Sequence, residues 1–183
     1  MRTARRFVLV HGLGLTLALL CDTAARADAA PSASAASLCA PAQTVLFDCS
    51  LHSGKRASIC ASGDLGPAAG SLQYVFGRRG RVEVQWPVGP EAADWRGSIK
   101  AGEVMYAGGG GAYLRLQAGP REYVVYSASG RGWGRKAGVM VLRAGQPKSV
   151  QRCVGPAHSL LGPSLRRQAN LSADEQELEL PSP

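Results

Sequence analysis

Hydrophobic and polar positions alternate with a period of two along much of the chain after residue 43. The clearest runs cover residues 72–76, 82–86 and 112–117. A period of two is the pattern of a β-strand with one face buried. Similar runs recur at near-regular spacing, with turn residues between them, and predict strands near 45–51, 56–62, 72–76, 82–86, 104–107, 112–117, 122–126, 138–142 and 149–153.

Eight or nine short strands without a long amphipathic helix are typical of an all-β protein. We therefore expect an antiparallel β-sandwich or barrel, because stacking or closing the sheets hides their edges. One or two short C-terminal helices complete the prediction. The first covers about 162–169, and the second begins at Ser172, where Glu175 completes a capping box.

The chain begins with the pattern of an export signal. Three arginines lie within the first six residues, an apolar run covers 7–20, and Ala25-Arg26-Ala27 follows. The apolar run is shorter than the roughly 20 residues that a spanning helix needs. We interpret 1–27 as a signal peptide and expect a periplasmic or extracellular protein without a transmembrane segment after cleavage. Cys21 follows Leu20 rather than a small residue, so we assign it to the discarded leader.

Composition divides the rest into three parts. Residues 28–38 are rich in Ala, Ser and Pro and predict a flexible lead-in. Residues 39–155 contain the strands and form the β domain. Residues 156–183 form a C-terminal extension with the short helices.

Four cysteines remain after the leader: Cys39, Cys49, Cys60 and Cys153. In a short exported chain they predict two disulfides rather than a metal site, since their spacing is unlike that of zinc ligands. We favour Cys49–Cys60 across a hairpin and Cys39–Cys153 between the ends of the domain. One observation opposes this choice. A Cys60 that faces Cys49 puts Ile59 on the opposite face, which must then be covered too.

The whole chain has a formal net charge of +8, and four of its 13 acidic residues lie between positions 174 and 179. A basic exported domain favours anionic partners, so an anionic envelope component or another exported protein is a candidate, whereas nucleic acid is not expected. Ordinary solubility is the other explanation of the charge, and the one that we favour.

The chain resembles a family of small uncharacterised exported proteins of proteobacteria with four cysteines. The matching segments run in the same order from about Cys39 to the C-terminus and include 46–49, 58–61, 72–77, 108–115, 123–126, 132–134, 136–139 and 161–163. The family implies no established activity, so no functional residue is transferred. The chain departs from the family at Val75, where arginine is usual.

Candidate catalytic patterns are weak. The run Gly108–Gly111 leads into a strand and not a helix, so we expect a bulge or a close approach of another group rather than a phosphate loop. Asp48, His52 and the serines lack a nucleophile motif. Glu83 and Glu122 are expected on the solvated surface. We expect no enzyme, no catalytic residue and no cofactor.

The best binding candidate is the segment around Trp133. Arg131, Arg135 and Lys136 surround this tryptophan, and an exposed loop of this kind stacks on a sugar or peptide while its cations meet negative charge. Alternatively, Trp133 folds back to cap the core. Arg78 and Arg79 add to this basic face only if the fold brings them near.

We therefore expect a non-enzymatic binding module of unknown ligand. A structural component of the cell envelope is one alternative. Another is an inhibitor of a foreign hydrolase such as lysozyme, because the segment 127–130 has a faint likeness to a Ser-Gly loop of one inhibitor group. A hydrolase is less favoured.

Overall fold

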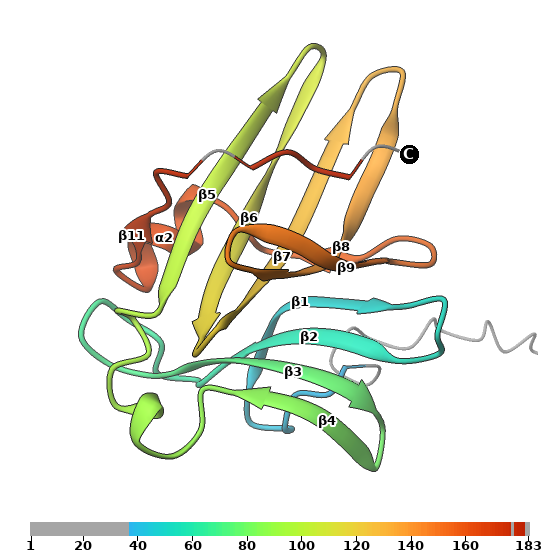
Figure 1. Cartoon of the computed structure of the whole chain (residues 1–183). Helices are drawn as coiled ribbons and strands as arrows, with labels where there is room; N and C mark the ends of the chain where they lie inside the picture. The colour runs from blue at the N-terminus through green and yellow to red at the C-terminus, as the bar shows by residue number, and fades with distance from the viewer. Residues whose placement is uncertain (1–36, 177, 182–183) are drawn as a thin grey trace, which may run out of the picture. The chain divides into compact units, whose positions relative to one another are not determined.

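Two β-sheets contain almost all of the regular structure (Figure 1). The computed structural model describes residues 37–176 and 178–181, so the predicted signal peptide and most of the lead-in lie outside the described residues. Nine longer strands, two strands of two residues and one short α-helix occur in the described part. The predicted all-β, sandwich-like fold is confirmed.

Sheet 1 contains five strands in the order β10-β1-β2-β3-β4, and every neighbouring pair is antiparallel. Its strands are β1 Thr44–Ser50, β2 Arg56–Ala61, β3 Leu72–Arg78, β4 Arg81–Trp86 and β10 His158–Ser159.

Sheet 2 contains six strands in the order β11-β5-β6-β7-β8-β9, and only β11 runs parallel to its neighbour. Its strands are β5 Ile99–Tyr106, β6 Gly109–Ala118, β7 Arg121–Gly130, β8 Gly134–Arg143, β9 Gln146–Arg152 and β11 Ser172–Ala173. A 3₁₀ helix, Gly89–Ala92, lies in the connection between the sheets, and β5 begins five residues before the expected start at Val104.

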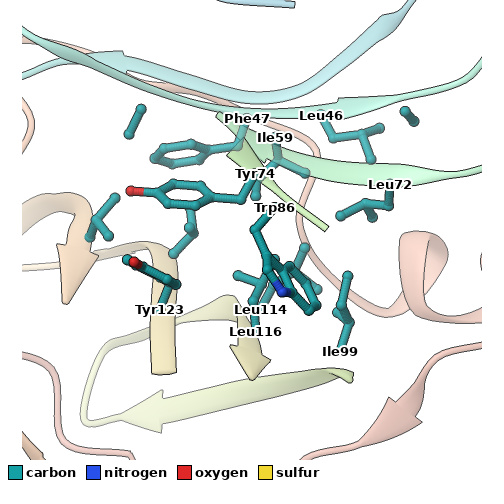
Figure 2. Close-up of a cluster of buried hydrophobic side chains, with 14 of the residues drawn as sticks. Leu46, Phe47, Ile59, Leu72, Tyr74, Trp86, Ile99, Leu114, Leu116 and Tyr123 are labelled. Carbon is teal, nitrogen blue, oxygen red and sulfur yellow. The ribbon is translucent and has the colours of Figure 1, made fainter. Parts of the chain in front are cut away.

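The two sheets enclose one large hydrophobic core between their inner faces. Tyr74 of β3 packs against Tyr123 of β7, with 5.1 Å between the ring centroids. Complete burial of a side chain of this size contributes about 1.5–3 kcal/mol. Figure 2 shows side chains that meet from the two sheets, among them Phe47, Ile59, Leu72 and Trp86 from sheet 1 and Ile99, Leu114 and Leu116 from sheet 2.

The strands of sheet 2 are longer than those of the sheet that covers them. Each of β6, β7 and β8 has ten residues, whereas the four main strands of sheet 1 have six or seven. Core residues occupy the part of these strands near the β6–β7 turn. The opposite part projects beyond sheet 1 (Figure 1). We call this part the distal half, and its two turns, 107–108 and 131–133, the tip.

Of the two helices expected in the C-terminal segment, the structure contains one. The helix α2, Pro163–Gln168, forms within the expected range. The second expected helix is wrong, because Ser172 and Ala173 pair with β5 as β11. The backbone N–H of Asp174 then donates to Ala101 O at 2.9 Å. These tertiary contacts override the local capping signal.

Beyond β11, residues 174–181 cross the outer face of sheet 2 (Figure 1). We call them the C-terminal strap and describe them apart from residue 177. Leu178 and Leu180 pack on a second hydrophobic cluster. This cluster contains Val104, Tyr113, Val124, Tyr126, Ala128, Met140 and Leu142, which lie on the outer face of sheet 2.

Two disulfides are present, but their pairing differs from the favoured one. Cys39 pairs with Cys60, and Cys49 pairs with Cys153; the Cα–Cα distances are 5.4 and 5.6 Å. The second disulfide joins β1 of sheet 1 to the end of β9 in sheet 2. It therefore links the two layers across 104 residues of sequence.

The register of β1 and β2 explains the error. Cys49 lies opposite Ala57, and Cys60 lies opposite Val45, so the two cysteines are not neighbours. Alternation also puts Cys60 on the outer face of sheet 1, beside the segment that contains Cys39. The backbone N–H of Leu38 donates there to Ser58 Oγ at 3.1 Å, so the end of the lead-in covers this face.

We predict that the two disulfides differ in their contribution to stability. Closing a longer loop removes more entropy from the unfolded chain. Replacing both Cys49 and Cys153 by alanine should lower the free energy of unfolding by about 4–5 kcal/mol, and replacing Cys39 and Cys60 by about 3 kcal/mol. Urea unfolding measures both values. The reverse order would contradict this account.

Candidate functional site

The inner face of the distal half forms a platform of small side chains across four strands. One row pairs Glu103, Ala112, Ser127 and Ala137 from β5 to β8. The next row pairs Met105, Gly110, Ser129 and Arg135. We call these eight residues the platform. Because glycine, alanine and serine occupy its centre, few side-chain atoms project from the sheet there.

The platform is the floor of a groove of about 480 Å³. Residues of the 153–163 segment form its wall, including Gly155, Ala157, Leu161 and Pro163. Large side chains would fill this space, as they do in the half of the sheet that faces sheet 1. The groove therefore exists because the platform residues at its floor are mostly small.

Polar and charged groups of the platform are available to a ligand. The hydroxyls of Ser127 and Ser129 make no hydrogen bond with the described residues, and Glu103 and Arg135 make no ion pair with them. Glu103 and Arg135 lie on strands three positions apart, which corresponds to about 14 Å. Met105 adds an apolar side chain that is 84% exposed. The groove thus offers hydroxyls, opposite charges and an apolar contact.

Trp133 lies at the tip and is half-buried. Its ring meets the ring of Tyr106 edge-on at a centroid distance of 5.9 Å, and Lys136 Nζ lies 5.3 Å from its centroid. The ring packs against the outer cluster of sheet 2, opposite the platform. Trp133 therefore folds back on the sheet, where it covers the outer cluster and not the core between the two sheets.

The glycine run allows another side chain to approach the backbone of the strand closely. A Cβ atom on Gly109 would lie 2.9 Å from the Trp133 ring, and one on Gly130 would collide with the same ring. The two glycines leave room for the Trp133 ring beside β6 and β7. No helix follows the run, since β6 begins at Gly109.

The two basic segments do not come together. Arg131 and Arg135 are exposed at the tip of sheet 2, whereas Arg78 and Arg79 belong to the β3–β4 hairpin of sheet 1. Figure 1 shows these hairpins at opposite ends. Arg78 also donates to the carbonyl of Gly54 at 2.7 Å, so it holds the neighbouring turn.

Asp48 and His52 do not form a catalytic pair. Asp48 is buried on the outer face of sheet 1, where Arg56 and Ser58 donate to its carboxylate. His52 is exposed in the β1–β2 turn.

Val75 lies beside Ser58 on the same outer face, remote from the platform. Over the residues that the structure describes, no group of three His, Cys, Asp or Glu side chains could hold a metal ion.

A buried ion cluster anchors the C-terminal strap. Arg115 Nε donates to Asp174 at 2.6 Å, and Arg115 Nη1 donates to Glu122 at 3.0 Å. Burial opposes the charged guanidinium, but the two carboxylates outweigh it and raise the pKa of Arg115. Glu122, expected on the solvated surface, is 15% exposed and ion-paired. Burial, followed by the hydrogen bond and charge of Asp174, raises the pKa of Tyr113 to about 12.

The platform could not be recognised from any one strand, because each strand has an ordinary pattern of residues. A signal was nevertheless present. Inward positions that carry Leu114 and Val125 near the core carry Gly110 and Ser129 farther along the same strands. Small residues at the inward positions of adjacent strands indicate a face that no second layer fills.

The chain was compared with protein-family models, curated proteins and solved structures, and none of them matches. Within the described residues, no helix is long and apolar enough to cross a membrane.

We predict that Asp174→Asn destabilises the protein by about 3 kcal/mol, because it leaves a buried guanidinium with one carboxylate partner. The same variant should move the pKa of Tyr113 from about 12 towards 10. Urea unfolding and a residue-resolved NMR titration measure the two effects. Glu175→Gln, at an exposed neighbouring carboxylate, is the control and should change neither value.

The titration of Tyr113 also gives a pH dependence. Its folded pKa of about 12 lies above the ordinary value of 10.0. The unfolded state therefore loses this proton first as the pH rises, so the Tyr113 contribution is complete below pH 10 and is lost between pH 10 and 12. This part of the loss should be smaller in Asp174→Asn, and equal loss in both proteins would contradict the assignment.

Proposed function

We propose that this chain is an exported, non-enzymatic binding domain that holds its ligand on the platform of sheet 2. The observation that carries the proposal is the uncovered inner face of the distal half. There a groove of about 480 Å³ presents hydroxyls and charges that pair with no described residue. A surface of this kind needs no further layer for folding, so its shape is available for recognition.

Two disulfides indicate an oxidising, non-cytoplasmic compartment. The leader pattern in residues 1–27 supports export to the periplasm or the exterior. The resemblance to small exported proteobacterial proteins supports the same conclusion. In that compartment the partners available are envelope components and other exported proteins.

The chemistry of the platform favours an extended ligand with an anionic group. Arg135 lines the groove on the β8 side, and Arg131 lies nearby at the tip. These cations attract negative charge, and the hydroxyls of Ser127 and Ser129 give directional hydrogen bonds. An anionic polysaccharide or an acidic stretch of an exported protein meets these requirements.

A binding role fits the groove better than a hydrolytic one. Ser127 and Ser129 have no histidine beside them to act as a base, and Glu103 is the one carboxylate among the described residues that line the groove. Nucleophilic hydrolysis needs a base, and glycoside cleavage commonly uses two carboxylates. The inhibitor hypothesis receives no added support, since residues 127–130 belong to β7 rather than to a protruding loop.

We predict that Ser129→Trp blocks ligand binding without unfolding the protein, because the indole would lie in the open groove. The measurement is a binding screen of the mature protein on an array of anionic glycans and acidic peptides. Ligands that bind the natural protein should bind the variant at least tenfold more weakly.

Val82→Trp is the matched control. Val82 is 49% exposed on the β3–β4 hairpin of sheet 1, and its replacement adds the same ring at a distant site. This variant should keep full binding. Equal binding by natural protein and Ser129→Trp, or an array without any bound ligand, would contradict the proposed function.

A further inference from the structure

One edge of sheet 2 is only half paired. The strand β11 lies beside β5 at Lys100 and Ala101, and the chain then leaves the edge at Asp174 to become the C-terminal strap. Figure 1 shows the remainder of β5 continuing towards the tip without a strand on that side. The unpaired part comprises residues 102–106.

The direction of the backbone groups follows from two hydrogen bonds. The N–H of Gln117 donates to Ser98 O, so even-numbered residues of this strand face β6. Asp174 donates to Ala101 O on the other side, so odd-numbered residues face the open edge. The N–H and C=O groups of Glu103 and Met105 therefore point outwards. None of these groups bonds to another residue of the described chain.

Unpaired strand edges of this kind pair readily with another extended segment, and proteins usually protect them. Here the protection is slight. Met105 is 84% exposed and Tyr106 is 39% exposed, and only Glu103 puts a charge in the unpaired part. Both faces beside the edge are hollow, with the platform groove on the inner side and a second cavity of about 400 Å³ on the outer side.

The charge around the edge defines the segment that would fit. The outer cavity is lined by Glu175 and Glu179 of the C-terminal strap, and Glu103 of the edge itself adds a carboxylate on the inner face. Asp174 also lines the outer cavity, but Arg115 neutralises it. Among the residues that the structure describes, no lysine or arginine lines this cavity, although the protein as a whole is basic. A segment with basic side chains on one face complements this edge.

A second copy of the chain is a poor occupant. If two β5 edges paired around a twofold axis, Glu103, Glu175 and Glu179 of both copies would come close together. Like charges that approach across an interface oppose association. The charge pattern therefore favours a different polypeptide.

We propose that residues 102–106 of β5 form a docking edge for an extended polypeptide segment of another protein, which adds as a strand beside β5, in line with β11. Backbone pairing with Glu103 and Met105 supplies the affinity. The segment alternates apolar side chains, which lie on the inner face near Met105, with basic side chains, which lie on the outer face near Glu175 and Glu179. This edge shares Glu103 and Met105 with the platform, but it binds through their outward backbone groups and does not depend on a ligand on the platform.

The test uses a short end-blocked peptide of alternating valine and lysine, with fluorescence anisotropy to measure binding to the mature protein. Two control peptides replace lysine by glutamate or carry N-methyl groups on alternate residues. The valine–lysine peptide should bind, and both controls should bind at least tenfold more weakly. Raising the salt concentration should weaken binding.

Met105→Pro removes an outward N–H without removing a bond to β6, and proline is tolerated at such edge positions. This variant should keep its unfolding midpoint and lose most of its affinity for the peptide. Met105→Ala removes the side chain but keeps the N–H, and should retain more affinity than Met105→Pro. Ser129→Trp, two strands away, should bind the peptide normally.

The two proposals fail separately. Peptide binding that is lost in Ser129→Trp but not in Met105→Pro would overturn the docking edge. Equal binding of the N-methylated or glutamate peptide, or no binding of any peptide, would also overturn it. None of these results bears on the array ligands of the platform.

Discussion

The long strands of sheet 2 impose the constraint on which the rest of the structure depends. β6, β7 and β8 are three or four residues longer than the strands that pack against them, so part of their sheet has no opposing layer. An uncovered sheet with large apolar side chains on both faces would be a liability in water. The two faces of the distal half avoid exposed large apolar side chains in different ways. The C-terminal strap covers the outer one, with Leu178 and Leu180 as its apolar contacts, and small polar residues line the inner one.

These two solutions give the molecule its asymmetry. The covered outer face carries a buried ion cluster around Arg115, whose carboxylate partners fix the start of the strap. The open inner face carries hydroxyls and charges that no described residue engages. The disulfide between Cys49 and Cys153 ties the two sheets together beside the groove wall. Both proposed interaction surfaces therefore belong to one projecting part of the sheet, next to the disulfide and the packed core.

Local patterns predicted much of the fold, because alternation and turn residues act over a few positions. They gave the nine longer strands and α2, but not contacts between distant segments. The capping signal at Ser172 lost to pairing with β5, and the cysteine pairing depended on a register that sequence spacing does not define. The alternation of Ile59 and Cys60 did contain the warning that Cys60 faces outwards. The platform depends on which strand ends remain uncovered, and this follows only from the packing of both sheets.

The two methionines of the β domain allow the most direct test of this arrangement. Met105 lies on the open distal half and is 84% exposed, whereas Met140 lies on the outer face among the cluster that contacts the strap and is 2% exposed. Mild peroxide converts accessible methionine to its sulfoxide, and mass spectrometry locates the product. We expect rapid oxidation of Met105 while Met140 remains intact in the folded protein. Protection of Met105, or oxidation of both residues at the same rate, would contradict the account.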